Sequence, residues 1–159
     1  MSWEKALLDV VADWRLEQRR GIVTSPDIDG LLSAALVSAE TGAKVIGFYT
    51  TSWLVLLDEA TPADAARALW LDHDISAPGV RCICQHLVMK ERTDLLSRRH
   101  RVSFNPNNFY LQSYKDSFRG SSGRKRDKYQ FSTSNMLFKV FGRAMPQPGS
   151  MELALLAHG

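Results

Sequence analysis

The chain has no long hydrophobic run, and this excludes proteins that are anchored by a membrane-spanning helix. None of its apolar stretches reaches the ~18–20 residues that such a helix needs. Residues 1–5 also lack the charged and then apolar layout of a secretion signal. We therefore expect a cytoplasmic protein.

Cysteine is equally scarce, with only Cys82 and Cys84 among 159 residues. The two alternate on one predicted strand, where this same-face spacing makes a disulfide awkward and favours two buried thiols. Without a second cysteine pair we expect no thiolate metal site. The chain also lacks a phosphate-binding Gly-rich loop of the Walker kind, and no catalytic triad is indicated.

What the chain does contain is enough apolar material for one globular domain, because 45% of its residues are hydrophobic. We expect a single domain over residues 1–159, forming the N-terminal part of a longer protein. Its first elements are a helix, a strand, a helix and a strand over residues 3–19, 21–25, 30–41 and 44–50. This order predicts a βαβ unit with parallel pairing.

The later elements extend that unit into an α/β domain with a mostly parallel central sheet flanked by helices. Residues 52–57 are apolar without a clear period, and no element is assigned to them. The expected elements are a helix at 61–67, strands at 68–72 and 80–88, a helix at 89–99, a strand at 101–104, and helices at 131–142 and 151–157. The link between the strands at 68–72 and 80–88 is too short for a helical crossover, which leaves their relative direction open.

Two aspartates occupy the turn between the first strand and the following helix. Asp27 and Asp29 are followed by Gly30, which permits a tight backbone, and the helix directs free N–H groups toward a bound anion. Divalent cations and phosphate esters both suit such a place. The alternative is a structural turn in which an aspartate caps the helix.

Further polar side chains follow other predicted strands. The whole set comprises Asp27, Asp29, Asp72, His73, Asp74 and His86. Open α/β sheets bind their ligands at strand ends, and carboxylates mixed with imidazole suit Mn²⁺, Mg²⁺ or Zn²⁺.

Several segments follow the order of motifs of one known family. Ser25-Pro26-Asp27-Ile28-Asp29-Gly30 precedes a Ser/Ala-rich helix, Asp72 ends a strand, and His86 stands within residues 83–87. Phe104-Asn105-Pro106-Asn107, the stretch 129–140 with its Phe138-Lys139 pair, and residues 151–159 follow. In these features the chain resembles the DHH phosphoesterase superfamily, in particular the N-terminal domain of RecJ-like single-strand exonucleases. The likeness covers most of the chain.

The resemblance implies a metal-dependent phosphodiesterase. It assigns divalent metal, Mn²⁺ or Mg²⁺, to Asp27, Asp29, Asp72, His86 and Asp74, and catalytic roles to Asp29, Asp72 and His86. The implied substrate is single-stranded nucleic acid or a nucleotide phosphoester. A missing C-terminal domain would complete the site.

This chain departs from the family pattern at three positions. Ser25 replaces the first His of His-x-Asp-x-Asp-Gly, and Gln85 and Leu87 replace the outer residues of Asp-His-His. In another register, Asp72-His73-Asp74 is the degenerate Asp-His-His. Loss of ligands weakens or removes a metal, so activity is expected to be reduced. A catalytically degenerate nucleic-acid-binding or scaffold domain is the alternative.

Asp-Ile-Asp-Gly also resembles the haloacid-dehalogenase phosphatases, which we rank lower. In that family Asp27 would be the nucleophile and Asp29 the acid/base. However, Leu31 follows the glycine and no later Gly-Asp-Asp cluster appears.

The positive charge is concentrated in residues 115–128, which carry six basic and two acidic residues in a chain of net charge +3. Their Gly/Ser-rich centre predicts a mobile loop. Cations interleaved with aromatic residues suit single-stranded nucleic acid, although a solvated charged face is the simpler interpretation. The predicted contacts are Arg119, Arg124, Lys125, Arg126 and Lys128.

Overall fold

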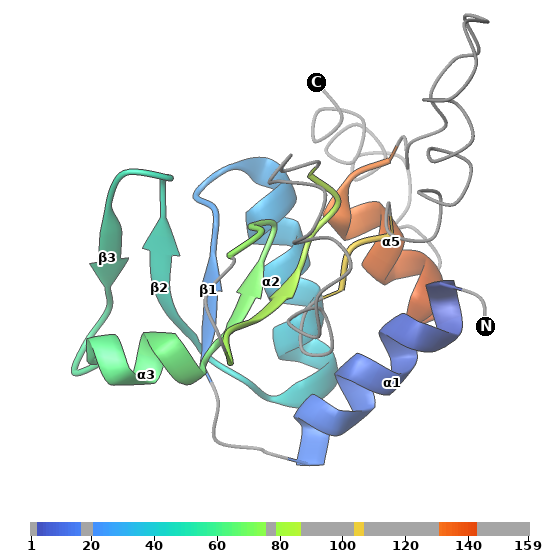
Figure 1. The fold of residues 1–159 in the computed structure, drawn as a ribbon, viewed down its shortest axis with the longest axis horizontal. Helices are drawn as coiled ribbons and strands as arrows, with labels where there is room; N and C mark the ends of the chain where they lie inside the picture. Colours follow the sequence, from blue (N-terminus) through green and yellow to red (C-terminus); the bar gives the residue numbers. More distant parts are fainter. Residues whose placement is uncertain (1–2, 17–20, 76–78, 87–103, 107–130, 143–159) are drawn as a thin grey trace, which may run out of the picture.

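The computed structural model describes residues 3–16, 21–75, 79–86, 104–106 and 131–142, which form helices around a central sheet (Figure 1). The helices are α1 (Trp3–Leu16), α2 (Ile28–Thr41), α3 (Pro62–Arg67) and α5 (Thr133–Val140). The strands are β1 (Ile22–Thr24), β2 (Val45–Tyr49), β3 (Leu54–Leu56), β4 (Leu69–Leu71) and β5 (Arg81–Ile83).

Within these residues the sheet has five strands in the order β3-β2-β1-β4-β5. β1 pairs in parallel with both β2 and β4, and β4 pairs in parallel with β5. β3 is the exception, because it runs antiparallel to β2. The prediction of an α/β domain with a mostly parallel sheet is confirmed, with one antiparallel edge strand added.

The βαβ unit that holds the two aspartates is set by local capping. Asp27 is the N-cap of α2, and its side chain accepts a hydrogen bond from the backbone of Gly30. Gly42 ends the helix with a φ of 75°, a left-handed conformation that glycine adopts without steric cost. The helix begins two residues earlier than expected, so Asp29 lies in its first turn.

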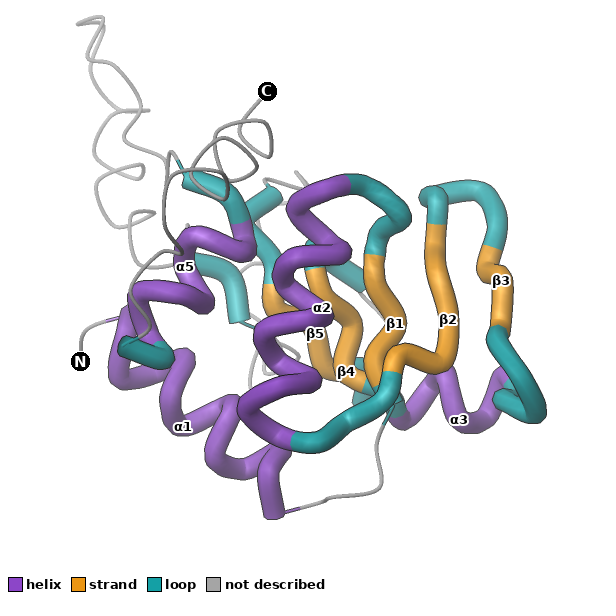
Figure 2. The backbone as a smooth tube through the Cα atoms, turned by 180° about the vertical axis from the view of Figure 1, so that it is seen from behind, coloured by secondary structure: helices purple, strands orange, loops and turns teal. Residues whose placement is uncertain are grey.

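The core lies on both faces of the sheet because strand side chains alternate. On one face Ile22, Leu69 and Ile83 pack with residues of α1, α2 and α5. Figure 2 shows α2 in front of β4 and β5, with α1 and α5 on the side of α2 away from β1. On the other face Val23, Trp70 and Cys82 pack with residues of α3. Both cysteines are buried thiols, as predicted from their spacing.

Other expectations are corrected by the structure. The apolar stretch at 52–57, to which no element was assigned, contains strand β3. Of the strand expected at 80–88, the described residues 80–86 include Arg81–Ile83 as β5, and Phe104 extends the sheet beside it through a parallel bridge to Ile83. The helix expected at 3–19 is described as far as Leu16. The elements expected at 89–99 and 151–157 lie outside the described residues.

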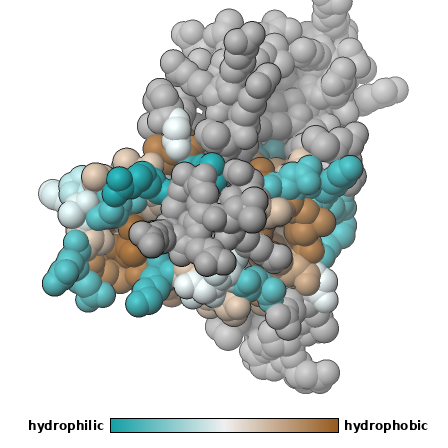
Figure 3. Space-filling view, turned by 90° about the horizontal axis from the view of Figure 1, so that it is seen from below, coloured by the Kyte–Doolittle hydropathy of each residue, from teal (hydrophilic) through white to brown (hydrophobic). Residues whose placement is uncertain are grey.

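Some large apolar side chains remain exposed. They include Trp53, Leu54 and Val55 at the edge strand β3. In Figure 3, hydrophobic side chains reach the surface between hydrophilic ones. None of the helices in the described part of the chain has the length and apolar character needed to cross a membrane.

Candidate functional site

The candidate site lies where β1 and β4 end, in the middle of the sheet. From β1 the chain passes through α2 to β2 on one side, whereas β4 lies on the other side of β1. Open α/β sheets bind ligands at the carboxyl ends of the strands where the direction changes in this way. Ser25 follows β1 and Asp72 follows β4, so both stand at these strand ends.

Asp27 is exposed, and its carboxylate is held by its own turn. Its Oδ1 lies 2.8 Å from the backbone N of Gly30 and 2.7 Å from Ser25 Oγ. A Cβ at Gly30 would lie 2.0 Å from Ser25 Oγ, so only glycine allows this approach. Asp27 therefore caps the helix through Oδ1, and Oδ2 takes no part in the capping bond.

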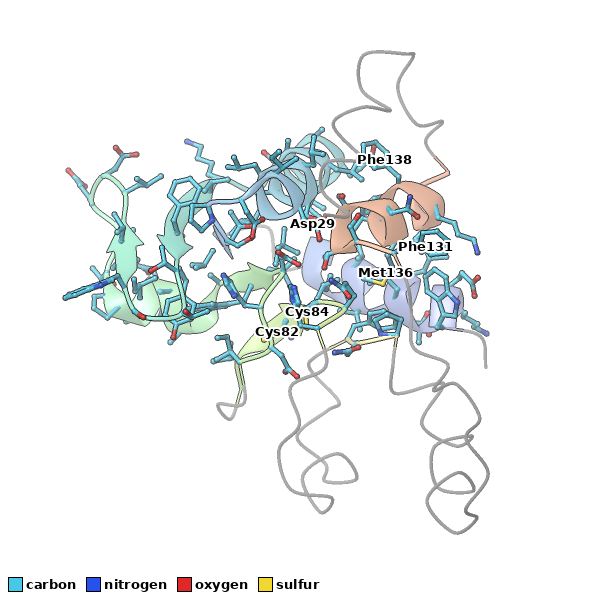
Figure 4. All side chains as sticks on the ribbon, turned by 90° about the horizontal axis from the view of Figure 1, so that it is seen from above. Asp29, Cys82, Cys84, Phe131, Met136 and Phe138 are labelled. Carbon is cyan, nitrogen blue, oxygen red and sulfur yellow. The ribbon has the colours of Figure 1, made fainter. Side chains whose placement is uncertain are left out.

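Asp29 is buried and faces another helix. Its Oδ2 accepts a hydrogen bond from the backbone N of Thr133 at 2.8 Å, and its Oδ1 accepts one from Ser134 at 2.7 Å. These N–H groups belong to the first turn of α5, where a carboxylate also benefits from the positive end of the helix dipole. Figure 4 shows Asp29 between α2 and α5. Asp29 thus joins two helices that are 104 residues apart in sequence at this contact.

Asp72 is the most constrained side chain of the site. It is 3% exposed and has a φ of 62°, a left-handed conformation that is uncommon outside glycine. Ser25 Oγ lies 3.0 Å from its Oδ2, and the Thr133 hydroxyl donates to its Oδ1 at 2.8 Å. Backbone outliers of this kind are concentrated at functional sites, where surrounding contacts hold them in place.

The electrostatic environment disfavours a negative charge on Asp72. Burial, and then the charge of nearby Asp29, raise the pKa of Asp72 to about 7, although hydrogen bonds from Thr133 and Ser25 and the charge of His86 act in the opposite direction. Ser25 has a single hydroxyl proton, which can serve Asp27 or Asp72 but not both. A proton or a cation at Asp72 would offset the uncompensated charge.

His86 approaches the same carboxylate because β4 and β5 are parallel. Its Nδ1 lies 3.5 Å from Asp72 Oδ1, and its side chain is half-exposed. It lies three residues beyond the end of β5, in a segment fixed by Asn105, whose Nδ2 donates to the backbone oxygen of His86 at 2.7 Å. The parallel pairing decides the question of direction that the sequence left open, and both Asp72 and His86 belong to the site.

His73 is directed elsewhere by its contacts, and Asp74 lies two residues beyond Asp72. His73 Nε2 is 2.8 Å from the backbone oxygen of Tyr49, and its ring packs edge-on against the rings of Tyr49 and Trp70. Burial lowers the pKa of His73. Asp74 is half-buried, and its charge contributes to the raised pKa of Cys84, which is due first to burial.

The donor atoms suit a hard divalent cation, but they do not form a closed cage. Within the described residues, no three His, Cys, Asp or Glu side chains are grouped closely enough to hold a metal ion. Asp27 and Asp72 share contact with Ser25 Oγ and therefore lie close to each other. Mg²⁺ is commonly bound by one or two carboxylates, with water and phosphate oxygens completing its shell. The arrangement fits that kind of site and provides no closed all-protein cage.

Sequence reasoning missed Thr133, Ser134 and the contact that Asn105 makes with His86. The signal for a helix start at Ser132 or Thr133 was visible, and Ser132 is indeed the N-cap of α5. Nothing in the sequence connects that start to Asp29 or Asp72. Gln85 is half-buried, whereas Leu87 and the five predicted nucleic-acid contacts in residues 115–128 lie outside the described residues.

No family model, curated protein or solved structure matches this chain.

Proposed function

We propose that the chain is a phosphoesterase domain of the DHH type, RecJ-like, that uses a divalent cation on phosphodiesters of single-stranded nucleic acid or on a nucleotide phosphoester, with reduced activity. One observation supports this best. Asp72, at the carboxyl end of β4, lies beside His86, shares the hydroxyl contact of Ser25 with Asp27, and is linked to Asp29 through Thr133. Ligand sites of open α/β sheets lie at this position.

Within this proposal the residues divide into two roles. Asp72 and Asp27 would hold Mn²⁺ or Mg²⁺, with His86 beside Asp72. When bound, the cation would polarise the phosphoester and lower the pKa of an attacking water. Asp29 is assigned a different role from the metal ligand that the sequence predicted, because both of its oxygens already accept hydrogen bonds from backbone N–H groups of α5. Its role is to position α5 against the site.

A second candidate is a catalytically degenerate domain that binds nucleic acid or serves as a scaffold. Two features favour it. The Asp29 carboxylate is occupied by backbone N–H groups of α5, and Ser25 stands where the family motif has a His. A carboxylate that caps a helix has fewer lone pairs left for a cation. The two candidates share the fold and differ in turnover.

The deciding experiment follows a labelled single-stranded oligonucleotide and a dinucleotide incubated with the full chain and Mn²⁺. Cleavage that is lost in Asp72→Asn and kept in Asp64→Asn, an exposed residue of α3, is the expected result. Saturable binding without cleavage would favour the degenerate domain. A phosphoenzyme formed on Asp27 from a phosphomonoester would instead identify a haloacid-dehalogenase-like phosphatase.

A further inference from the structure

We propose that Thr133 is a positioning residue that orients the carboxylate of Asp72 for a divalent cation. The inference rests on the proposed function, because it concerns the same site. It adds a residue that has no acidic or imidazole side chain and lies 61 positions from Asp72 in the sequence.

Thr133 contacts both buried carboxylates of the site. Its hydroxyl donates to Asp72 Oδ1 at 2.8 Å, and its backbone N donates to Asp29 Oδ2 at 2.8 Å. The residue is fully buried, at 0% exposure, so water does not compete for either bond. One residue therefore fixes the spacing between two like-charged groups.

The orientation of Asp72 depends on two hydroxyls, one for each oxygen. Ser25 Oγ meets Oδ2 and Thr133 Oγ1 meets Oδ1, so rotation of the carboxylate would break both contacts. Each carboxylate oxygen can accept about two hydrogen bonds, which leaves a lone pair on each for a cation. Threonine suits this role because its β-branched side chain has few rotamers.

The test compares Mn²⁺ affinity, measured by calorimetry on the full chain, with thermal unfolding of the same samples. Thr133→Val keeps the branched shape and the backbone bond to Asp29 but removes the hydroxyl. We expect it to weaken Mn²⁺ binding about 10-fold, as is usual when a group that orients a metal ligand is lost. Thr133→Ser, which restores a hydroxyl, should bind within about 2-fold of the wild type.

Thr41→Val is the matched control. Thr41 Oγ1 donates to the backbone oxygen of Val37 at 2.6 Å and accepts from the backbone N of Ala43 at 3.3 Å, so this variant also loses hydroxyl bonds. Thr41 is the last residue of α2, and a helix of this length places it about 20 Å from the first turn of α2, which holds Asp29. Its Mn²⁺ affinity should equal that of the wild type even if its melting temperature falls.

The outcomes separate this inference from the proposed function. Wild-type affinity in a folded Thr133→Val would overturn the role of Thr133 and leave the metal site standing. If Thr133→Val does not fold, Thr133→Ala and Thr133→Ser provide the same contrast, and equal affinities in that pair would overturn the role. A wild-type chain that binds no Mn²⁺ would overturn the proposed metal site and this inference with it.

Discussion

Replacing Asp72 with asparagine should stabilise the metal-free protein at alkaline pH. Burial and the charge of Asp29 raise the pKa of Asp72 to about 7, which is about three pH units above that of an unperturbed aspartate. Between about pH 4 and pH 7 the folded state therefore binds a proton that the unfolded chain releases. The stability of the wild type is fully present below this window and falls as the pH rises through it.

The size of the effect follows from that shift. Three pH units correspond to an upper limit of about 4 kcal/mol, at 1.36 kcal/mol per unit. Relaxation and the entry of water reduce this value, so we expect Asp72→Asn to gain about 1–3 kcal/mol at pH 8.5. For a domain of this size that gain corresponds to a rise in melting temperature of roughly 3–10 °C.

The asparagine side chain can keep the contacts of the site. Its amide oxygen can accept from the Thr133 hydroxyl, and its amide nitrogen can donate to Ser25 Oγ, which then donates to Asp27. Asparagine also tolerates the left-handed backbone of residue 72 better than most residues. The substitution therefore changes the charge and leaves the geometry in place.

Urea denaturation in EDTA, at pH 5 and pH 8.5, would measure the difference between the variant and the wild type. Glu59→Gln is the control for removal of an exposed charge, because Glu59 lies at the surface in the loop before α3. An equal gain at both pH values would refute the electrostatic reasoning. So would an Asp72→Asn variant that is less stable than the wild type at pH 8.5.

Three other predictions follow from the same contacts and from the charge pattern. Asp29→Asn should destabilise the protein by about 2–3 kcal/mol, because its amide N–H₂ would face a backbone N–H of α5; equal urea midpoints for variant and wild type would contradict this. Mn²⁺ affinity in calorimetry should fall roughly tenfold per pH unit below about pH 7, since a proton competes for Asp72; a flat profile between pH 5.5 and 7 would exclude Asp72 as a ligand. The triple alanine variant of Arg124, Lys125 and Arg126 should bind a labelled single-stranded oligonucleotide with a weaker salt dependence. In fluorescence anisotropy across a salt series, the slope of log affinity against log salt concentration should flatten by about 2. An unchanged slope would mean that these residues are only a solvated charged face.

Features that depend on neighbours in the chain could be predicted from the sequence. Three such features are the turn at Asp27, the glycine that ends α2, and the capping box of Thr61 and Asp64. Each of them depends on hydrogen bonds between residues at most four positions apart. The buried strands could also be located, because their apolar runs and flanking turns are local patterns. These features determine the βαβ unit and place Asp27 and Asp29 at its turn.

The direction of β5 and the existence of β3 could not be predicted in this way. The nine-residue link from Asp72 to Val80 permits either direction, and only the packing of β5 beside β4 selects the parallel one. β3 lacks a clear period because, at the edge of the sheet, its side chains are exposed or only half-buried. Pairing direction matters for the candidate site, since it brings His86 to Asp72.

The sequence alone identified the acidic side chains of the candidate site, whereas the tertiary structure decided which contacts each of them makes. Asp27 and Asp29 look equivalent in the chain. In the fold, Asp27 caps its own helix at the surface and Asp29 is buried against the N-terminus of α5. The raised pKa of Asp72 likewise arises from burial and from a second carboxylate 43 positions away, and both exist only when the distant segments have packed together.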